Sequence, residues 1–299
     1  GSGLMTKKWS SRLTFFAFVV LMVGLGSNDS LRGIFSTIFQ EHFSLTTTQL
    51  GLIVTASYIG NLVFLLVGGN LSTRFSKKRV LQVLILIWMA ALALFAFTSN
   101  YTVLLIGMAL ALGSSTLLNT TMNLITPLLF ATAPGFFVNF LFFTQEIGTS
   151  GSQYILGSHA DGFAFWQHTN LVLLILGAVA FVLLLFCNVP EEAAAPADAP
   201  AQKGGYDWRI IVPYVLVFGF YFIAEHGVMN WMVAYGVDGL GLPQASAAKY
   251  LSVFFGGMMI GRLCLSPLVD KLGALKSLAA FGGVSCVLYL ICLLYTSDA

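Results

Sequence analysis

The chain has 299 residues, of which 58% are hydrophobic and only 9% are charged, and its formal net charge is +2. A soluble domain usually carries about 25% charged residues, so this composition cannot cover a water-facing surface and lipid must be the solvent for much of the chain. The small net charge, with no basic run interleaved with aromatic residues, argues against nucleic acid as a partner. The composition therefore predicts an integral membrane protein.

Long apolar runs between charged or turn-rich breaks predict about nine transmembrane helices. A bilayer core of about 30 Å needs about 20 apolar residues in a helix, and these continuous runs lack the alternation of barrel strands. The runs are 12–40, 48–72, 79–98, 101–130, 136–158, 169–189, 209–237, 245–270 and 274–294. The expected fold is an all-α polytopic membrane protein with the lipid bilayer as its partner.

Most basic residues lie in breaks that alternating helices would place on one side of the membrane. They are Lys7, Lys8, Arg12, Arg74, Lys77, Lys78, Arg79, Lys203, Arg209, Lys271 and Lys276. The opposite breaks hold Glu41, Asp161 and Asp238, with only Lys249 near that side. Because basic loops stay on the cytoplasmic side, we expect a cytoplasmic N-terminus (1–11) and a multi-pass protein of the cell inner (plasma) membrane. We also expect a monomer.

An Ala/Pro-rich, acidic segment at 190–208 predicts a cytoplasmic linker between two membrane bundles. A six-helix bundle (12–189) precedes it, and a partial bundle of three helices (209–299) follows. A second bundle that matches the first would need three further helices, so we expect a C-terminally truncated chain. The tail 292–299 resembles translated adaptor sequence, and we expect it to be artefactual.

An internal repeat supports the same division. Parallel repeats across a central linker are a transporter architecture with the solute site between the halves. An offset of 197 residues aligns the loop after the second span with the loop after the eighth, Leu45 with Leu242, Gly60 with Gly257, and Asn28-Asp29 with Glu225-His226.

The two repeated loops, Gly69-x-x-x-Thr73-Arg74-x-Ser76-Lys77 and Ser266-x-x-x-Asp270-Lys271-x-Gly273, are similar to the cytoplasmic signature of the major facilitator superfamily. Within it, the chain resembles the branch of fucose:proton symporters. The similar residues are Asn28-Asp29 with Phe39-Gln40, Asn123 with Pro127, Asn139 with Gly148, Tyr221-x-x-x-Glu225 with Trp231 and Tyr235, and Ile260-Gly261-Arg262. Two departures stand out: Asn119 replaces a carboxylate of the fucose member, and Arg32 has no counterpart that can be placed.

The resemblance implies an alternating-access secondary transporter that needs no cofactor, couples to a proton and takes a sugar or other small neutral polar solute. No phosphate-binding loop, catalytic triad or metal-type constellation indicates an enzyme, an ATP-driven pump or a metal site. Two alternatives stay open. One is a carrier for a different organic solute, in either direction, and the other is a non-transporting membrane sensor on the same fold.

Ionisable residues within the spans are functional candidates because each costs at least ~2.5 kcal/mol in mid-membrane unless it has a partner or faces a cavity. Asp29 is the first proton-coupling candidate, and a static ion pair with Arg32 on the same helix face is the alternative. Glu225 and His226 occupy the repeat-equivalent position and are further proton or solute candidates. Glu146 could serve a relay, without support from the resemblance.

Amide side chains can donate to and accept from the hydroxyl groups of a polar solute. The solute-binding candidates of this kind are Asn28, Asn119, Asn123, Asn139 and Gln145. Hydrogen bonding between helices is the alternative role. Trp231 and Tyr235 could stack on a sugar ring or, equally, form wall packing or an interfacial belt.

Basic and acidic residues near the cytoplasmic side are candidates for a gating or conformational role. They are Arg32, Arg74, Lys77, Lys78, Arg262, Asp270 and Lys271. For Arg262 solute binding is the alternative, and for the loop residues it is orientation charge alone.

Overall fold

A computed structural model describes residues 2–191, 205 and 207–297. Side chains are not described for 2–5, 72–73, 266–267, 269–270, 274 and 296–297. The chain divides into two compact units, 1–255 and 256–299. Each unit is considered by itself below.

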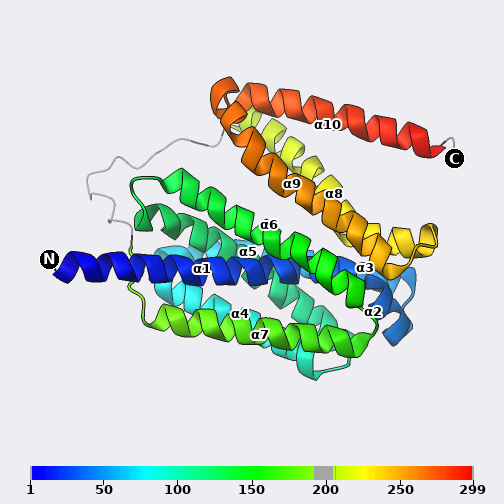
Figure 1. Ribbon diagram of the computed structural model, residues 1–299, viewed down its shortest axis with the longest axis horizontal. Helices are drawn as coiled ribbons and strands as arrows, with labels where there is room; N and C mark the ends of the chain where they lie inside the picture. Colours follow the sequence, from blue (N-terminus) through cyan, green and yellow to red (C-terminus); the bar gives the residue numbers. More distant parts are fainter. Residues whose placement is uncertain (1, 192–204, 206, 298–299) are drawn as a thin grey trace. The chain divides into compact units, whose positions relative to one another are not determined.

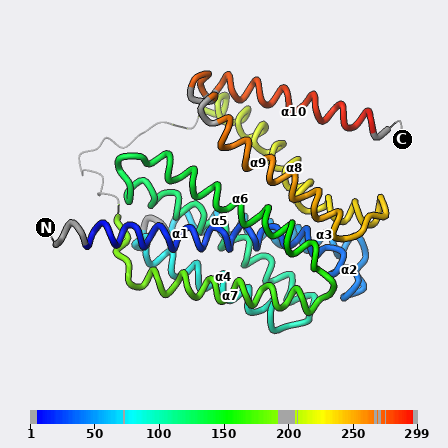
Figure 2. Tube along the Cα trace, in the orientation of Figure 1, coloured from blue at the N-terminus to red at the C-terminus, as the bar shows by residue number. Residues whose placement is uncertain are grey.

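The described secondary structure is helical throughout, as the apolar runs predict. The helices are α1 (Ser2–Ile34), α2 (Ser36–Phe43), α3 (Thr47–Arg74), α4 (Lys77–Phe97), α5 (Tyr101–Leu129), α6 (Pro134–His159), α7 (Phe163–Leu185), α8 (Trp208–Ala234), the π-helix η1 (Tyr235–Gly239), α9 (Gln244–Leu272) and α10 (Ala274–Ser297). Within the first unit, the trace in Figure 2 shows the long helices from α3 to α7 running back and forth. The all-α polytopic fold is confirmed.

Eight of the described helices are long and apolar enough to cross a membrane. The one predicted span that is not among these eight is the fifth, 136–158. It corresponds to α6, which has 26 residues but is more polar than the other long helices. Its polar residues include Thr144, Glu146 and Gln153, and all three are buried inside the bundle. The reduced hydropathy of α6 therefore reflects an interior position among other helices rather than a loop.

Short polar connections end one helix and begin the next. Thr46 and Gln49 form a capping box at the start of α3, which satisfies two backbone N–H groups that a helix leaves unpaired. Ser76 caps α4 and Asn100 caps α5, each through its side-chain oxygen. These caps fix where the second, third and fourth spans begin.

The centre of the first unit is α1, which packs mainly against α6 and also against α7 (Figure 1). A Cβ atom at Gly26 would overlap the backbone of Gln145, and one at Gly148 would overlap the backbone of Val23. Small residues let the backbones of membrane helices approach this closely. The two glycines therefore bring α1 and α6 into direct backbone contact.

Three boundaries differ from the sequence prediction. The first helix begins at Ser2 rather than at residue 12. The first span was expected as one helix over 12–40, but it is interrupted at Phe35, which lies between α1 and α2 with φ −97° and ψ 7°. The sixth span begins at Phe163 rather than at residue 169. Its first turns carry the aromatic residues Phe163, Phe165 and Trp166. They pack inside the bundle, with Trp166 against Phe95 of α4 and Gln167 donating to the Thr98 carbonyl at 3.2 Å.

Most of the predicted linker, 190–208, lies outside the described residues. The division into halves at that segment therefore stays a prediction. In the second unit, α10 continues through residues 292–297, and the proposed artefactual nature of this tail is likewise untested.

Candidate solute and proton site

Asp29 and Arg32 occupy the last two turns of α1, just before the interruption at Phe35. Their spacing of three residues puts them on one helix face. The Ser115 hydroxyl of α5 donates to the Asp29 carboxylate, at 3.2 Å from Oδ1 and 3.4 Å from Oδ2. Asp29 is half-buried, so a carboxylate within a membrane helix is held by a neighbouring helix and keeps part of its surface open.

Arg32 connects α1 to α3 and α8. Its Nε donates to Asn230 Oδ1 at 3.4 Å, and its guanidinium carbon lies 5.9 Å from the centre of the Tyr58 ring. Asn230 Nδ2 in turn donates to the Tyr58 hydroxyl at 3.2 Å and to the His226 carbonyl at 2.7 Å. A polar cluster from three helices thus surrounds the guanidinium.

Three amide side chains form a hydrogen-bonded ladder on α5 and α6. Asn123 Nδ2 donates to Asn119 Oδ1 at 2.7 Å, and Asn119 Nδ2 donates to Gln145 Oε1 at 3.0 Å. Ser115, Asn119 and Asn123 follow one another at four-residue intervals, which places them on one face of α5. The ladder therefore continues directly from the serine that holds Asp29.

Glu225 and His226 lie half-buried on α8. The His226 ring stacks on Tyr58, with ring centres 5.5 Å apart and planes 20° from parallel. Asn28 is buried on α1. Of the predicted residues, the structure thus gathers Asp29, Arg32, Asn119, Asn123, Gln145 and His226 with their neighbours within the first unit.

Other predicted residues lie apart from this cluster. Asn139 is exposed on α6, and Trp231 and Tyr235 are 37% and 59% exposed. Arg262 and Lys271 belong to the second unit and are exposed. The side chain of Asp270 lies outside the described residues.

The basic residues at the start of α4 contact the segment that follows α7. Lys78 Nζ donates to the carbonyls of Leu185 and Cys187, at 3.3 and 2.7 Å, where α7 ends. The backbone N–H of Lys77 donates to the Glu191 carboxylate at 2.6 Å, while Arg74 is exposed. These are helix-terminus and acidic partners of the kind expected for the loop, and its conformational role stays a prediction.

Three members of the cluster escaped the sequence analysis: Tyr58, Ser115 and Asn230. A tyrosine or serine in an apolar run reads as ordinary packing, so neither gave a signal. Asn230 did give one, because it lies one helical turn after His226 and is an amide within a predicted span.

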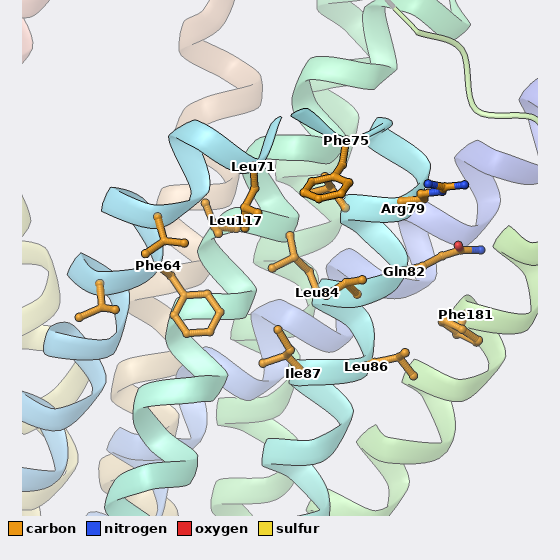
Figure 3. A pocket seen from close by; sticks show the side chains of 14 residues that line it. Phe64, Leu71, Phe75, Arg79, Gln82, Leu84, Leu86, Ile87, Leu117 and Phe181 are labelled. Atoms are coloured by element: carbon orange, nitrogen blue, oxygen red, sulfur yellow. The ribbon is translucent and has the colours of Figure 1, made fainter. Parts of the chain in front are cut away.

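A large apolar hollow of the first unit lies elsewhere. It holds about 760 Å³ between α3 and α4, with Leu117 of α5 at its side (Figure 3). Its lining is apolar except for Arg79 and Gln82, and several of its residues, such as Val67 and Val83, are exposed on the outer surface. This groove contains none of the polar cluster, so we assign it to the lipid-facing surface.

Gly33 allows α1 and α8 to meet beside Arg32. A Cβ atom there would overlap the backbone carbonyl oxygen of Met229, so Gly33→Leu is expected to push α8 away. Thr37 Oγ1 and Gln244 Oε1, which lie 2.8 Å apart nearby, provide a reporter. With both positions changed to cysteine and the native cysteines replaced by serine, the yield of the cross-link should fall several-fold.

Gly227→Leu is the matched control, because a Cβ atom at Gly227 of α8 would have no neighbour within 4 Å among the described residues. Equal cross-linking in the two variants would contradict the close approach at Gly33.

Comparison with known proteins extends these observations. A model of the Major Facilitator Superfamily matches residues 3–299. The chain is 24% identical to the cis,cis-muconate transport protein of Acinetobacter baylyi, over 92% of this chain and 70% of that protein. It is 23% identical to the L-fucose-proton symporter of Escherichia coli, over 88% and 68%.

A solved structure of a Major Facilitator Superfamily transporter, FucP, in the outward conformation has a similar fold. Its TM-score is 0.67 at 21% identity, with 94% of this chain and 77% of that chain covered. The chain thus spans about two thirds to three quarters of the length of these three proteins. Because the family model matches nearly all of the sequence, the chain belongs to the Major Facilitator Superfamily, a family of transporters rather than enzymes.

Proposed function

We propose that the full-length protein is a proton-coupled secondary carrier for a small, hydroxyl-bearing organic solute, a sugar in the first instance. One observation carries the proposal: the half-buried carboxylate of Asp29 accepts from Ser115, which lies one turn before Asn119 on the same face of α5, and Asn119 is the middle of the amide ladder Asn123–Asn119–Gln145. A carboxylate can take up and release the coupling proton, and amides can both donate to and accept from hydroxyl groups.

The relatives support this proposal without deciding the solute. One is named for L-fucose and proton symport, and another for cis,cis-muconate. The distribution of basic residues supports a plasma-membrane location with a cytoplasmic N-terminus. We further propose that the protein works as a monomer.

The contacts between α8–α9 and the first six spans bear on alternating access. Ser150 of α6 and Ser252 of α9 exchange hydrogen bonds of 3.0 and 3.1 Å, and Gln244 Nε2 donates to the Ile34 carbonyl at 2.6 Å. With the N-terminus in the cytoplasm, Gln244 lies at the opposite end of the bundle. We propose that these contacts close the external side and separate when the site opens outward.

Asp29→Asn provides the test of proton coupling. Asparagine keeps the shape of the side chain and an oxygen for the Ser115 hydroxyl, but it cannot bind a proton. In proteoliposomes holding the full-length protein, uptake driven by a pH gradient should be lost, while solute exchange at equal pH should persist.

Asp161→Asn is the control, because Asp161 is an exposed carboxylate in the connection between α6 and α7. Concentrative uptake that survives unchanged in Asp29→Asn would exclude Asp29 as the coupling site.

A further inference from the structure

Arg32 is a permanent positive charge in an unusual setting. Its side chain is only 4% exposed, and arginine is not deprotonated in proteins. Its hydrogen bond to Asn230, at 3.4 Å, is long for a charged donor. Its Nη2 atom is buried and has no hydrogen-bonding partner among the described residues. The neutral neighbours of the guanidinium therefore satisfy its donors only in part.

Among the described residues, no carboxylate forms a direct ion pair with Arg32. A guanidinium binds a carboxylate best through two parallel hydrogen bonds. Asn230 and Tyr58, which contact Arg32, are both neutral. Asp29, on the same face of α1, has its two carboxylate oxygens directed to Ser115 of α5. An anionic partner from outside the chain would complete the site.

Charge balance during transport points in the same direction. With Asp29 ionised and Arg32 charged, these two residues of α1 are together neutral, and Glu225 and His226 of α8 are the other titratable groups nearby. Proton binding to Asp29 leaves the charge of Arg32 uncompensated, and a buried unpaired charge is strongly unfavourable. A neutral solute would leave that imbalance in place, whereas a solute carboxylate would remove it. Proton and anion together would then cross with the site neutral in both its empty and its loaded state.

We propose that the solute is a polyhydroxy carboxylate, a sugar acid, whose carboxylate is bound by Arg32. The amide ladder on α5 and α6 contacts its hydroxyl groups, and Asp29 carries the proton that accompanies it. This rests on the carrier function proposed above and replaces the neutral sugar by its acidic counterpart. Arg32 thereby acts as a solute-binding residue rather than a gate.

The test compares ligands that differ in charge but hardly in shape. Proteoliposomes with the full-length protein and an imposed pH gradient are given D-glucuronate, D-galacturonate, D-glucose, D-galactose and the neutral D-glucuronamide. We expect accumulation of at least one of the acids and none of its neutral counterparts. Because proton and anion enter together, this uptake should not change when the membrane potential is varied.

Arg32→Gln should lower uptake of the accepted acid about 10- to 100-fold, the loss expected for removing a charge-assisted hydrogen-bonding pair. Arg32→Lys keeps the positive charge but cannot form two parallel hydrogen bonds to a carboxylate, so this variant should retain part of the uptake. Arg79→Gln, at an exposed cytoplasmic position, is the control. The comparison of uronate with uronamide uses the unaltered protein. It therefore tests the sugar-acid proposal even if an Arg32 variant fails to fold.

The outcomes separate the two proposals. Accumulation of a neutral sugar to the same extent in the unaltered protein and in Arg32→Gln would overturn the sugar-acid assignment and leave the proton-coupled carrier standing. Equal transport of glucuronate and glucuronamide would overturn it as well. If the pH gradient drives no uptake of any of the five compounds, the carrier proposal and this inference both fail.

Discussion

Gly148→Leu is expected to leave little of the protein stably folded. The α-carbon of Gly148 on α6 lies against the backbone of Val23 on α1, and any side chain there would overlap it. Overpacking usually costs ~1–3 kcal/mol where side chains can shift aside. Here the obstacle is a helix backbone, so α1 and α6 must separate, and the expected cost lies at or above the upper end of that range.

The consequence extends beyond one contact because α1 is the central helix of the first unit. Thr149 Oγ1 donates to the Gly26 carbonyl at 3.2 Å, and Ser27 Oγ approaches the Gly148 carbonyl at 3.3 Å. Separation of the helices would break both hydrogen bonds. It would also displace Asp29, half a turn beyond Ser27, from Ser115.

Gly151→Leu makes a matched control. Gly151 lies one turn further along α6 at the side of a surface groove, and a Cβ atom there has no neighbour within 4 Å among the described residues. Thermal stability of the two variants in detergent, followed by size-exclusion chromatography, gives the measurement. A Gly148→Leu protein as monodisperse and heat-resistant as Gly151→Leu would show that the close backbone approach is not needed.

The existence and order of the helices could be predicted because each span is recognisable from its own stretch of sequence. An apolar run of about 20 residues has few alternatives in a bilayer, and the caps Thr46, Ser76 and Asn100 mark helix starts in the sequence. The interruption at Phe35 could not be predicted this way. The residues around it contain no proline, and Gly33 makes its contact with Met229, nearly 200 positions away.

The candidate site was predictable to the extent that its members are out of place in lipid. Asp29, Arg32 and Asn119 can be recognised from the sequence because they are polar residues in apolar runs. Their partners do not, because Ser115 and Tyr58 have side chains that a membrane helix tolerates anywhere. The role of Arg32 was also hidden, since an unused guanidinium nitrogen appears only when the three helices around it are in place.

Asn119→Leu is expected to lower the affinity for the transported solute about 10- to 100-fold, with little loss of helix packing. Asn119 is the middle of the amide ladder: it accepts from Asn123 and donates to Gln145. Leucine has a similar volume but can do neither, so both outer amides lose the bond that orients them toward the solute. Leaving such groups unpaired costs ~1–3 kcal/mol, which corresponds to this change in affinity.

Thr120→Leu is the control, since Thr120 is the next residue on α5, is exposed and bonds only to the Thr116 carbonyl, at 3.0 Å, among the contacts of the structure. The measurement is the half-saturating concentration for solute exchange in proteoliposomes, together with the melting temperature of each variant.

Asn119→Asp refines the comparison, because an ionised aspartate still accepts from Asn123 but cannot donate to Gln145. An intermediate affinity for this variant would assign part of the effect to each bond. Unchanged affinity in Asn119→Leu would instead make the ladder a purely structural link between α5 and α6. Other residues would then have to bind the solute.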